Sequence, residues 1–100
     1  MTVQYDFEWD PTKARANLKK HGVSFEVAVT IFRDPQALTV FDEEHDENEE
    51  RWITMGIAEE GNLLVVIHTF KEMTSQEVII RMISARRATR RERRQYGASL

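Results

Sequence analysis

The sequence predicts an α+β fold, in which an N-terminal strand and a pair of helices pack on one face of an antiparallel sheet and a short helix ends the chain. This prediction rests on a change of hydrophobic period at Pro35. Before this residue, apolar side chains recur mainly at helical spacing, whereas after it they gather in runs rich in Ile, Val and Thr that are typical of strands. A chain of 100 residues encloses one hydrophobic core, so residues 1–100 are expected to form a single domain.

The first elements are a strand and a helix. Tyr5–Trp9 alternates aromatic and acidic residues, which is the period of a short half-buried strand. Asp10–Pro11 then starts a helix, because aspartate caps free backbone N–H groups and proline suits the first helical position. The helix is expected to run to Lys20 or His21 and to stop at Gly22, which adopts a left-handed backbone at low cost.

A second helix follows closely and completes a helical hairpin. The first helix has a thin apolar face, chiefly Ala14 and Leu18, so it should lie across a neighbour without being engulfed. Ser24 can cap the next helix, which should end at Asp34–Pro35. Its apolar residues recur at the spacing of one helical face, at Phe25, Ala28, Val29 and Phe32.

Beyond the second helix, the chain predicts an antiparallel meander and a last helix. The strands are expected at Ala37–Phe41, Arg51–Ala58, Leu63–Phe70 and Glu77–Ala85. Glu60–Gly61 marks a tight hairpin between two of them, and residues 71–76 a looser loop. Thr89–Glu92 fits a capping box ahead of a short helix that reaches Tyr96.

Strand register decides which polar side chains share a face. If the tight hairpin pairs Glu59 with Asn62, Arg51 and His68 project from the same side of the sheet. The loop before the last strand is too long to fix the next register. One choice of register brings Arg81 to the side of His68, and the other separates them.

Charge is segregated along a chain whose formal net charge is −3. Seven carboxylates and no Lys or Arg lie between Asp42 and Glu50, whereas seven arginines and a single acid, Glu92, lie between Arg81 and Arg94. A basic surface patch can therefore exist on an acidic molecule. The alternative is that both stretches are solvated surfaces that screen each other.

The composition excludes several classes of protein and site. With no cysteine, disulfides, thiolate nucleophiles and cysteine-ligated zinc are excluded. Three histidines are too few for a histidine-built metal cage, so no metal and no other cofactor is expected. The chain has no uncharged apolar run of about 18 residues and no export signal at its start, which predicts a cytoplasmic protein without a membrane partner.

The arginines near the C-terminus are the strongest candidates for binding. Arg86 and Arg87 lie between an apolar strand and a capped helix, so at least one should emerge at the rim of the sheet. Arg90 and Arg91 occupy the first turn of that helix, where each opposes the helix dipole by a few tenths to ~1 kcal/mol. The acidic segment 42–50 could compensate, as could a phosphate, which suits guanidinium groups and helix N-termini.

The remaining candidates each have a structural alternative. His68 titrates in a range that suits proton transfer, but an imidazole at the end of an apolar strand is more often a hydrogen-bonded core residue. Arg81 either binds an anion or is an ordinary solvent-facing arginine. His21 fits a capping role at a helix C-terminus, and Trp9 and Trp52 fit a core better than a surface that stacks bases.

Five sequence blocks, in this order, then bear on function: Phe7–Pro11, Asn17–Phe25, Asp34–Pro35, Arg51–Ile53 and Ile83–Arg93. Together they resemble the BrnT toxin family of bacterial type II toxin–antitoxin systems. The resemblance spans about residues 5–96. It implies a RelE-like fold, ribonuclease activity that arrests translation, neutralisation by a BrnA antitoxin, and binding of the toxin–antitoxin complex to its own operator DNA.

Position by position, the motifs of that family fall on His21–Gly22, Arg51–Trp52 and Arg86–Arg87. Two features depart from the family, whose members are commonly basic: the negative net charge and the acidic segment 42–50. Because phosphate neutralisation dominates binding to RNA, both features weaken the expected affinity. A RelE-like fold does not by itself identify a general base.

The leading hypothesis is a metal-independent endoribonuclease that uses the 2′-hydroxyl of RNA as nucleophile. The expected catalytic residues are Arg51, His68, Arg86 and Arg87. The expected RNA-binding residues are Lys20, Arg81, Arg90 and Arg91. Two alternatives stay open: a non-catalytic nucleic-acid-binding module, and a protein-interaction domain that uses its charged surfaces.

Overall fold

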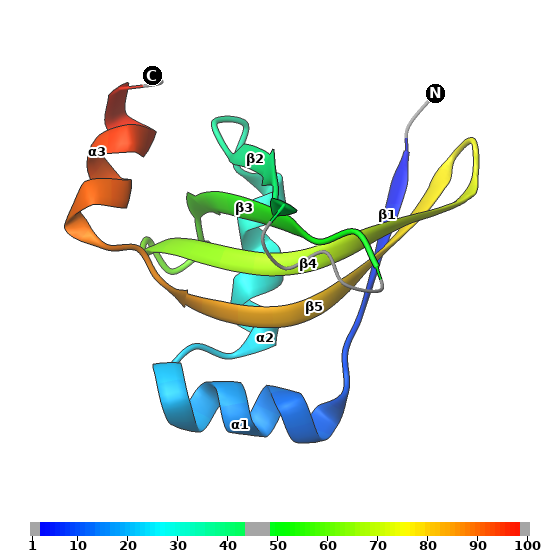
Figure 1. Cartoon of the computed structure of the whole chain (residues 1–100), viewed down its shortest axis with the longest axis horizontal. Coiled ribbons are helices and arrows are strands. Elements are labelled where there is room, and N and C mark those ends of the chain that lie inside the picture. Colours follow the sequence, from blue (N-terminus) through cyan, green and yellow to red (C-terminus); the bar gives the residue numbers. More distant parts are fainter. Residues whose placement is uncertain (1–2, 44–48, 99–100) are drawn as a thin grey trace.

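The computed structural model describes residues 3–43 and 49–98. It confirms the α+β fold, and one sheet contains all the strands of the described part of the chain (Figure 1). The elements in chain order are β1 Gln4–Glu8, α1 Pro11–His21, α2 Phe25–Ala28, the 3₁₀ helix η1 Val29–Arg33, β2 Leu38–Phe41, β3 Trp52–Ile57, β4 Leu63–Thr74, β5 Glu77–Arg87 and α3 Arg90–Ala98.

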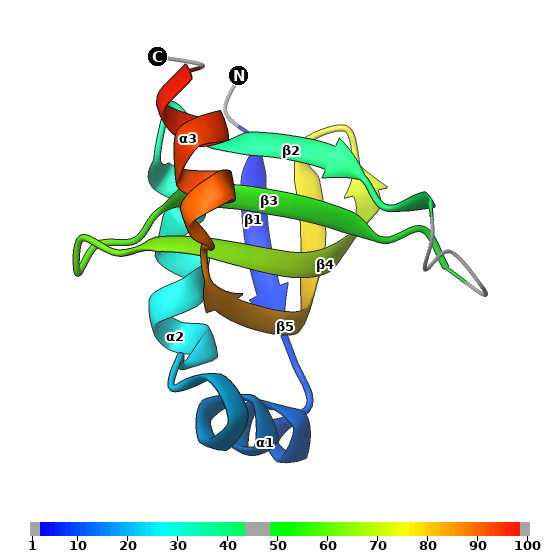
Figure 2. The ribbon, with the colours of Figure 1, turned by 60° about the vertical axis from the view of Figure 1, so that its left-hand side comes forward.

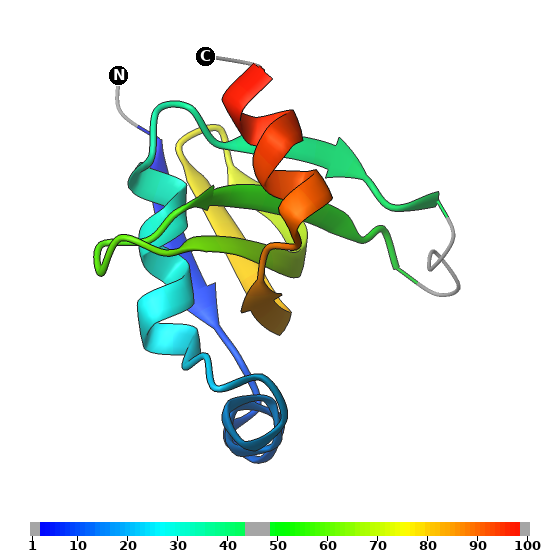
Figure 3. The same cartoon turned by 90° about the vertical axis from the view of Figure 1, so that its left-hand side faces the viewer.

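The strands are arranged in the order β1-β5-β4-β3-β2. The antiparallel meander from β2 to β5 is as predicted. The N-terminal strand differs from the expectation that it packs on a face of the sheet, because β1 pairs in parallel with β5 at one edge. Helix α2 covers one face, here called the helix-side face, and α3 crosses the other, here called the open face (Figures 2 and 3).

Helix α1 has the predicted caps but a different buried face. The Asp10 carboxylate accepts a hydrogen bond from the N–H of Thr12 (2.8 Å), and Gly22 ends the helix with φ 70°. Leu18, however, is 50% exposed, and Asn17 is buried in its place. The Asn17 amide donates to the carbonyl of Ala85 (2.9 Å) and accepts from its N–H (3.1 Å), so a polar clamp fixes α1 to β5.

The second helix begins as predicted and then tightens. The Ser24 hydroxyl accepts from the N–H of Val27 (3.1 Å), but the α-helix gives way to η1 at Val29. The residues that follow are β-branched, and the Thr30 hydroxyl donates to the carbonyl of Val27 (2.6 Å). Both features weaken regular helix. The result is a short segment that packs Ile31 and its neighbours into the core.

The predicted register of the tight hairpin is wrong by one residue. Its loop has three residues and not two, since the N–H of Ala58 donates to the carbonyl of Asn62 (2.9 Å) and Gly61 adopts φ 102°. A left-handed glycine at this place is the usual way to close a three-residue hairpin. Trp52 therefore faces His68, and Arg51 lies on the opposite face of the sheet from this histidine.

The last hairpin is longer than predicted, and it contains a bulge. Strands β4 and β5 continue through most of the expected 71–76 loop and turn at residues 75–76. A register shift between Ile67 and His68 leaves Met82 opposite His68 and Arg81 opposite Thr69. The alternative that the sequence left open is thereby settled, because Arg81 and His68 lie on opposite faces.

Hydrophobic clusters lie on both faces of the sheet. The larger cluster fills the space under α2 and η1 and includes Phe25, Ile31, Leu64 and Ile80. A smaller cluster lies under α3, around Val65 on the open face. The second cluster holds α3 against the open face.

Candidate functional site

Three side chains from neighbouring strands form a row across the open face. Thr69 on β4 is paired with Arg81 on β5. Arg51 comes one residue before β3 and extends the β3–β4 register, so it lies on the other side of Thr69. We call Arg51, Thr69 and Arg81 the arginine row. It places two guanidinium groups on one face, with a hydroxyl between them.

Arg51 is held by its backbone and has an unsatisfied side-chain donor. Its carbonyl accepts a hydrogen bond from the N–H of Asp42 (2.9 Å), which continues the pairing of β2 with β3. Its Nε atom is buried and has no hydrogen-bond partner among the described residues. A buried N–H group without a partner costs about 1–3 kcal/mol. An anion that gained access to this buried group and accepted from it would recover that energy.

Arg81 is bound to a carboxylate of the protein itself. Its guanidinium forms an ion pair with Glu49, and the two side chains are 34% and 43% exposed. Glu8 of β1 lies directly across from Arg81. Exposed ion pairs of this kind contribute little net free energy, so an anionic ligand can compete with Glu49 for Arg81. These residues, with Glu50 and Thr69, line a cavity of about 380 Å³.

Arg86 lies on the same face, but its side chain binds helix α3. Its guanidinium donates two hydrogen bonds to the carboxylate of Glu92, at 2.8 and 2.9 Å. This interaction is the main cause that lowers the pKa of Glu92 to about 2 and raises the pKa of Arg86 above its usual range. Glu92 also accepts from the N–H of Thr89 (2.8 Å), which confirms the predicted capping box. Glu92 thus supplies the compensation that the arginines of the first turn require.

His68 lies inside the protein, on the helix-side face. It is 0% exposed, and its Nε2 atom lies 2.7 Å from the hydroxyl of Thr54. The rings of Phe32 and Phe70 pack edge-on against the imidazole, with centroids 5.0 and 4.8 Å away. Burial lowers the pKa of His68 to about 4, so it is neutral at pH 7. His68 is therefore separated from the arginine row by the sheet.

The other predicted residues are distributed around this face. Arg87 is exposed and points to the opposite side of β5 from Arg86. Arg90 and Arg91 are exposed on the first turn of α3. Lys20 is exposed on α1 and shares a shallow depression with residues of β5. The predicted meeting of arginines with an imidazole does not occur.

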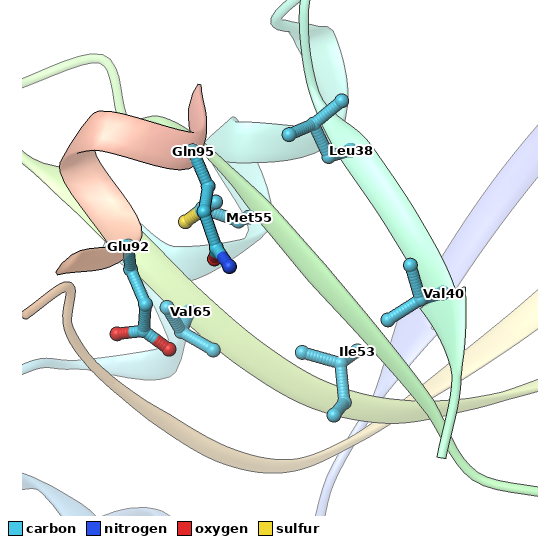
Figure 4. Close-up of a pocket in the computed structure, with 7 residues that line it drawn as sticks. All are labelled: Leu38, Val40, Ile53, Met55, Val65, Glu92 and Gln95. Atoms are coloured by element: carbon cyan, nitrogen blue, oxygen red, sulfur yellow. The ribbon is translucent and has the colours of Figure 1, made fainter. Parts of the chain in front are cut away.

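An apolar groove lies between α3 and strands β2–β4 on the open face (Figure 4). Its volume is about 440 Å³. Strand side chains form its floor and α3 contributes two polar residues, so the lining consists of Leu38, Val40, Ile53, Met55, Val65, Glu92 and Gln95. Its only ionisable lining residue is Glu92, already bound to Arg86. The groove is suited to apolar contacts and not to catalysis.

Comparison with known proteins identifies the family. A sequence model described as "Ribonuclease toxin, BrnT, of type II toxin-antitoxin system" matches residues 9–92. The chain belongs to the BrnT family of ribonuclease toxins. The BrnT ribonuclease toxin of Brucella abortus, solved by crystallography, is similar in fold, with a TM-score of 0.60 and 24% sequence identity. That match covers 87% of this chain and 100% of the Brucella chain. No curated protein sequence matches this chain.

Membership of the BrnT family places the chain among the toxins of type II toxin–antitoxin systems, which implies an antitoxin partner. The matched span includes Arg51, Arg81 and the Arg86–Arg87 pair. Within the described ranges, no helix is long and apolar enough to cross a membrane. Over the same ranges, no group of three or more His, Asp or Glu side chains is arranged to hold a metal ion.

Sequence reasoning missed two features of this BrnT-family chain, one in the arginine row and one that fixes α1 to the sheet. It did not place Thr69 between two arginines, because both the three-residue hairpin and the bulge after Ile67 move the register. It also overlooked Asn17, although this residue lies three positions after Ala14 and so on the same helical face. A polar residue on the inward face of a helix was the available indication.

Proposed function

We propose that this BrnT-family chain is a metal-independent endoribonuclease that cleaves messenger RNA and so inhibits translation. In the proposed reaction the 2′-oxygen of a ribose forms a bond to the adjacent phosphorus, and the bond from phosphorus to the 5′-oxygen breaks. The proton of the 2′-hydroxyl passes to water or a nearby carboxylate, and the 5′-oxygen takes up a proton from solvent. The products carry a 2′,3′-cyclic phosphate and a 5′-hydroxyl.

The arginine row is the observation that supports this proposal. Arg51 and Arg81 lie on either side of Thr69, so a phosphate above Thr69 can accept hydrogen bonds from both guanidinium groups. The Nε of Arg51 has no hydrogen-bond partner among the described residues. Positive groups fixed in this way stabilise the charge that develops on the phosphate oxygens. Because the nucleophile belongs to the RNA itself, orientation and charge stabilisation are the main tasks left to the protein.

The other predicted residues receive revised roles. Arg86 and Arg87 lie at the end of β5 and would contact phosphates of the bound RNA. Lys20, Arg90 and Arg91 would contact phosphates at the edges of the same RNA-binding surface. Arg86 must then share its guanidinium with Glu92, since the two form a bidentate pair. His68 is assigned a positioning role, because its burial keeps it from the RNA while its hydrogen bond to Thr54 orders β3 against β4.

We propose that a BrnA-type antitoxin neutralises the toxin and that the complex of the two binds operator DNA. The acidic character of this chain supports a complex in which the antitoxin, and not the toxin, supplies most of the contacts to DNA. Carboxylates next to the arginine row, such as Glu8 and Glu49, repel a nucleic acid. An antitoxin with basic surfaces would both bind this chain and supply the positive charge that DNA binding needs.

The test is incubation of the purified toxin with end-labelled RNA in EDTA, with and without ribosomes. We expect cleavage under chelation, products with cyclic phosphate ends, and no cut at a position where a 2′-deoxy nucleotide replaces the ribose. Retention of RNA without cleavage would instead identify a nucleic-acid-binding module. If the protein neither binds nor cleaves RNA, the remaining interpretation is a protein-interaction domain.

A further inference from the structure

A separate pocket, on the helix-side face, combines aromatic rings with carboxylates. It has a volume of about 440 Å³. We call it the aromatic pocket, and its lining consists of Tyr5, Glu50, Trp52, Phe70, Glu72 and Val78. None of these residues belongs to the arginine row, and none is a Lys or Arg.

The rings are placed by the strand register. Tyr5, Val78 and Glu72 form one row across β1, β5 and β4, and Phe70 follows two residues before Glu72 on the same face. Trp52 and Phe70 meet at 66° with centroids 5.7 Å apart, so their planes form a corner. Tyr5 is 50% exposed and Phe70 is 37% exposed. Exposed aromatic side chains that gather in one pocket favour an interaction site.

The chemistry of this pocket fits a positively charged side chain. A cation is attracted to the faces of aromatic rings, and tryptophan and tyrosine bind it best. Two exposed carboxylates, Glu50 and Glu72, add charge complementarity and supply acceptors for an ammonium or guanidinium group. Glu72, which does not line the cavity of Arg81, also disfavours a nucleic acid, whose phosphates it would repel.

The position of the pocket indicates what its occupant does. Glu50 and Phe70 line both the aromatic pocket and the cavity that contains Arg81, so the two sites share a border. A protein segment anchored in the aromatic pocket would therefore reach the rim of the proposed RNA site. A partner bound in this position would block access to the RNA site and so inhibit the toxin.

We propose that the aromatic pocket binds a Lys or Arg side chain of the antitoxin and so anchors it beside the arginine row. The identity of this partner rests on the proposed function. The attraction between ring faces, carboxylates and the bound cation would hold the antitoxin segment in register. The repulsive element is Glu72, which lines the aromatic pocket but not the cavity of Arg81 and would exclude RNA from that pocket.

The first test measures the affinity of the antitoxin for the full toxin chain and its variants. We expect Glu50→Gln/Glu72→Gln to weaken binding at least tenfold and to flatten its salt dependence, and Tyr5→Leu to weaken it at least threefold. The matched control is Glu26→Gln/Glu59→Gln, which changes the charge equally at exposed sites elsewhere and should stay within twofold of wild type.

A second test uses a defined probe and the two tryptophans as reporters. A short arginine-containing peptide should shift the indole N–H resonance of Trp52 but not that of Trp9, which packs against Phe25. The same peptide with citrulline in place of arginine should shift neither, because citrulline lacks the positive charge. An equal response to both peptides would overturn the proposal.

Further outcomes separate this proposal from the proposed function. If Glu50→Gln/Glu72→Gln and its matched control bind the antitoxin with equal affinity, the aromatic pocket does not bind the antitoxin. Loss of RNA binding by Tyr5→Leu, with antitoxin binding intact, would replace it with a base-stacking site. If wild type fails to cleave RNA while the pocket variant still loses antitoxin affinity, the ribonuclease mechanism fails and the aromatic pocket stands.

Discussion

Replacing Glu92 with glutamine should release α3 from the end of β5. In the wild type, the Glu92 carboxylate accepts two hydrogen bonds from Arg86 and one from the N–H of Thr89. Glutamine has the same shape and can still serve in a capping box. Glu92→Gln therefore removes the ion pair and leaves most of the cap, so the loss can be assigned to the Arg86 contact.

The size of the effect follows from the pKa of Glu92. Its fall from 4.5 to about 2 corresponds to ~3 kcal/mol at 1.36 kcal/mol per unit. Water screens part of this interaction, because the side chains of Arg86 and Glu92 remain 39% and 23% exposed. We therefore expect a loss of about 1–2 kcal/mol in the free energy of unfolding. For a domain of this size, that lowers Tm by roughly 5–10 °C.

The dependence on pH gives the decisive comparison. Since the pKa of Glu92 in the folded protein lies below its ordinary value, the pair stabilises the fold fully above about pH 4.5, and this contribution is lost as the pH falls towards 2. Urea unfolding of wild type and Glu92→Gln should give its largest difference near pH 7 and a smaller one at pH 3. A difference that is absent, or that does not change with pH, would refute the role of the pair.

Four other substitutions test the fold that carries the site. Asn17→Ala should cost about 2–4 kcal/mol in urea unfolding, because the N–H and carbonyl of Ala85 lose their buried partners, whereas Leu18→Ala should cost under 1 kcal/mol. The pKa of His68 is lowered to about 4, so wild type should lose up to about 3 kcal/mol as the pH falls from 6.5 to 4, and His68→Gln should lose less. Gly56→Ala should cost about 1–3 kcal/mol, because the new Cβ would lie 3.1 Å from the carbonyl oxygen of Ile31.

Each of these predictions has a clear contrary result. If Leu18→Ala lowers the free energy of unfolding more than Asn17→Ala does, then α1 buries the face with Leu18, as the sequence predicted. Identical acid stability of wild type and His68→Gln would mean that His68 is not buried in its neutral form. Unchanged stability of Gly56→Ala would show that η1 lies farther from β3 than described.

The elements of this fold were predictable because local chemistry determines them. The caps at Asp10, Ser24 and Gly22 and the box at Thr89 are set by residues within one turn, and the structure confirms them. The shift from α2 to η1 was not predicted, because the spacing of apolar residues is similar in both kinds of helix. The pairing of β1 with β5 joins segments that are distant in the sequence, so the local residue pattern of neither strand predicts it.

The candidate site was harder to predict than the fold. One residue more in the loop that contains Gly61 reverses the face on which every side chain of β4 lies relative to β3, and this moved His68 away from Arg51. The Arg86–Glu92 pair was within reach of the sequence, since the capping box already placed Glu92 near the end of β5. The ion pair of Arg81 with Glu49 joins residues 32 apart, and only the folded chain brings them together.

Replacing both Arg86 and Arg87 with alanine would be a poor test of catalysis, because Arg86 also binds Glu92 of α3. Loss of Arg86 also leaves Glu92 unpaired and loosens α3, so a loss of growth arrest would combine two effects. Arg87→Ala alone avoids this difficulty, because the side chain of Arg87 is exposed and does not hold the helix.

The most direct test of the central claim is the rate of RNA cleavage in EDTA by Arg51→Gln and Arg81→Gln under single-turnover conditions. Each should cleave at least tenfold more slowly than wild type, because each removes one of the two charges beside Thr69. Arg33→Gln, which removes the same charge from an exposed position on η1, should stay within twofold. Wild-type rates for both row variants, with their folding confirmed by Tm, would contradict the assignment of the arginine row to catalysis.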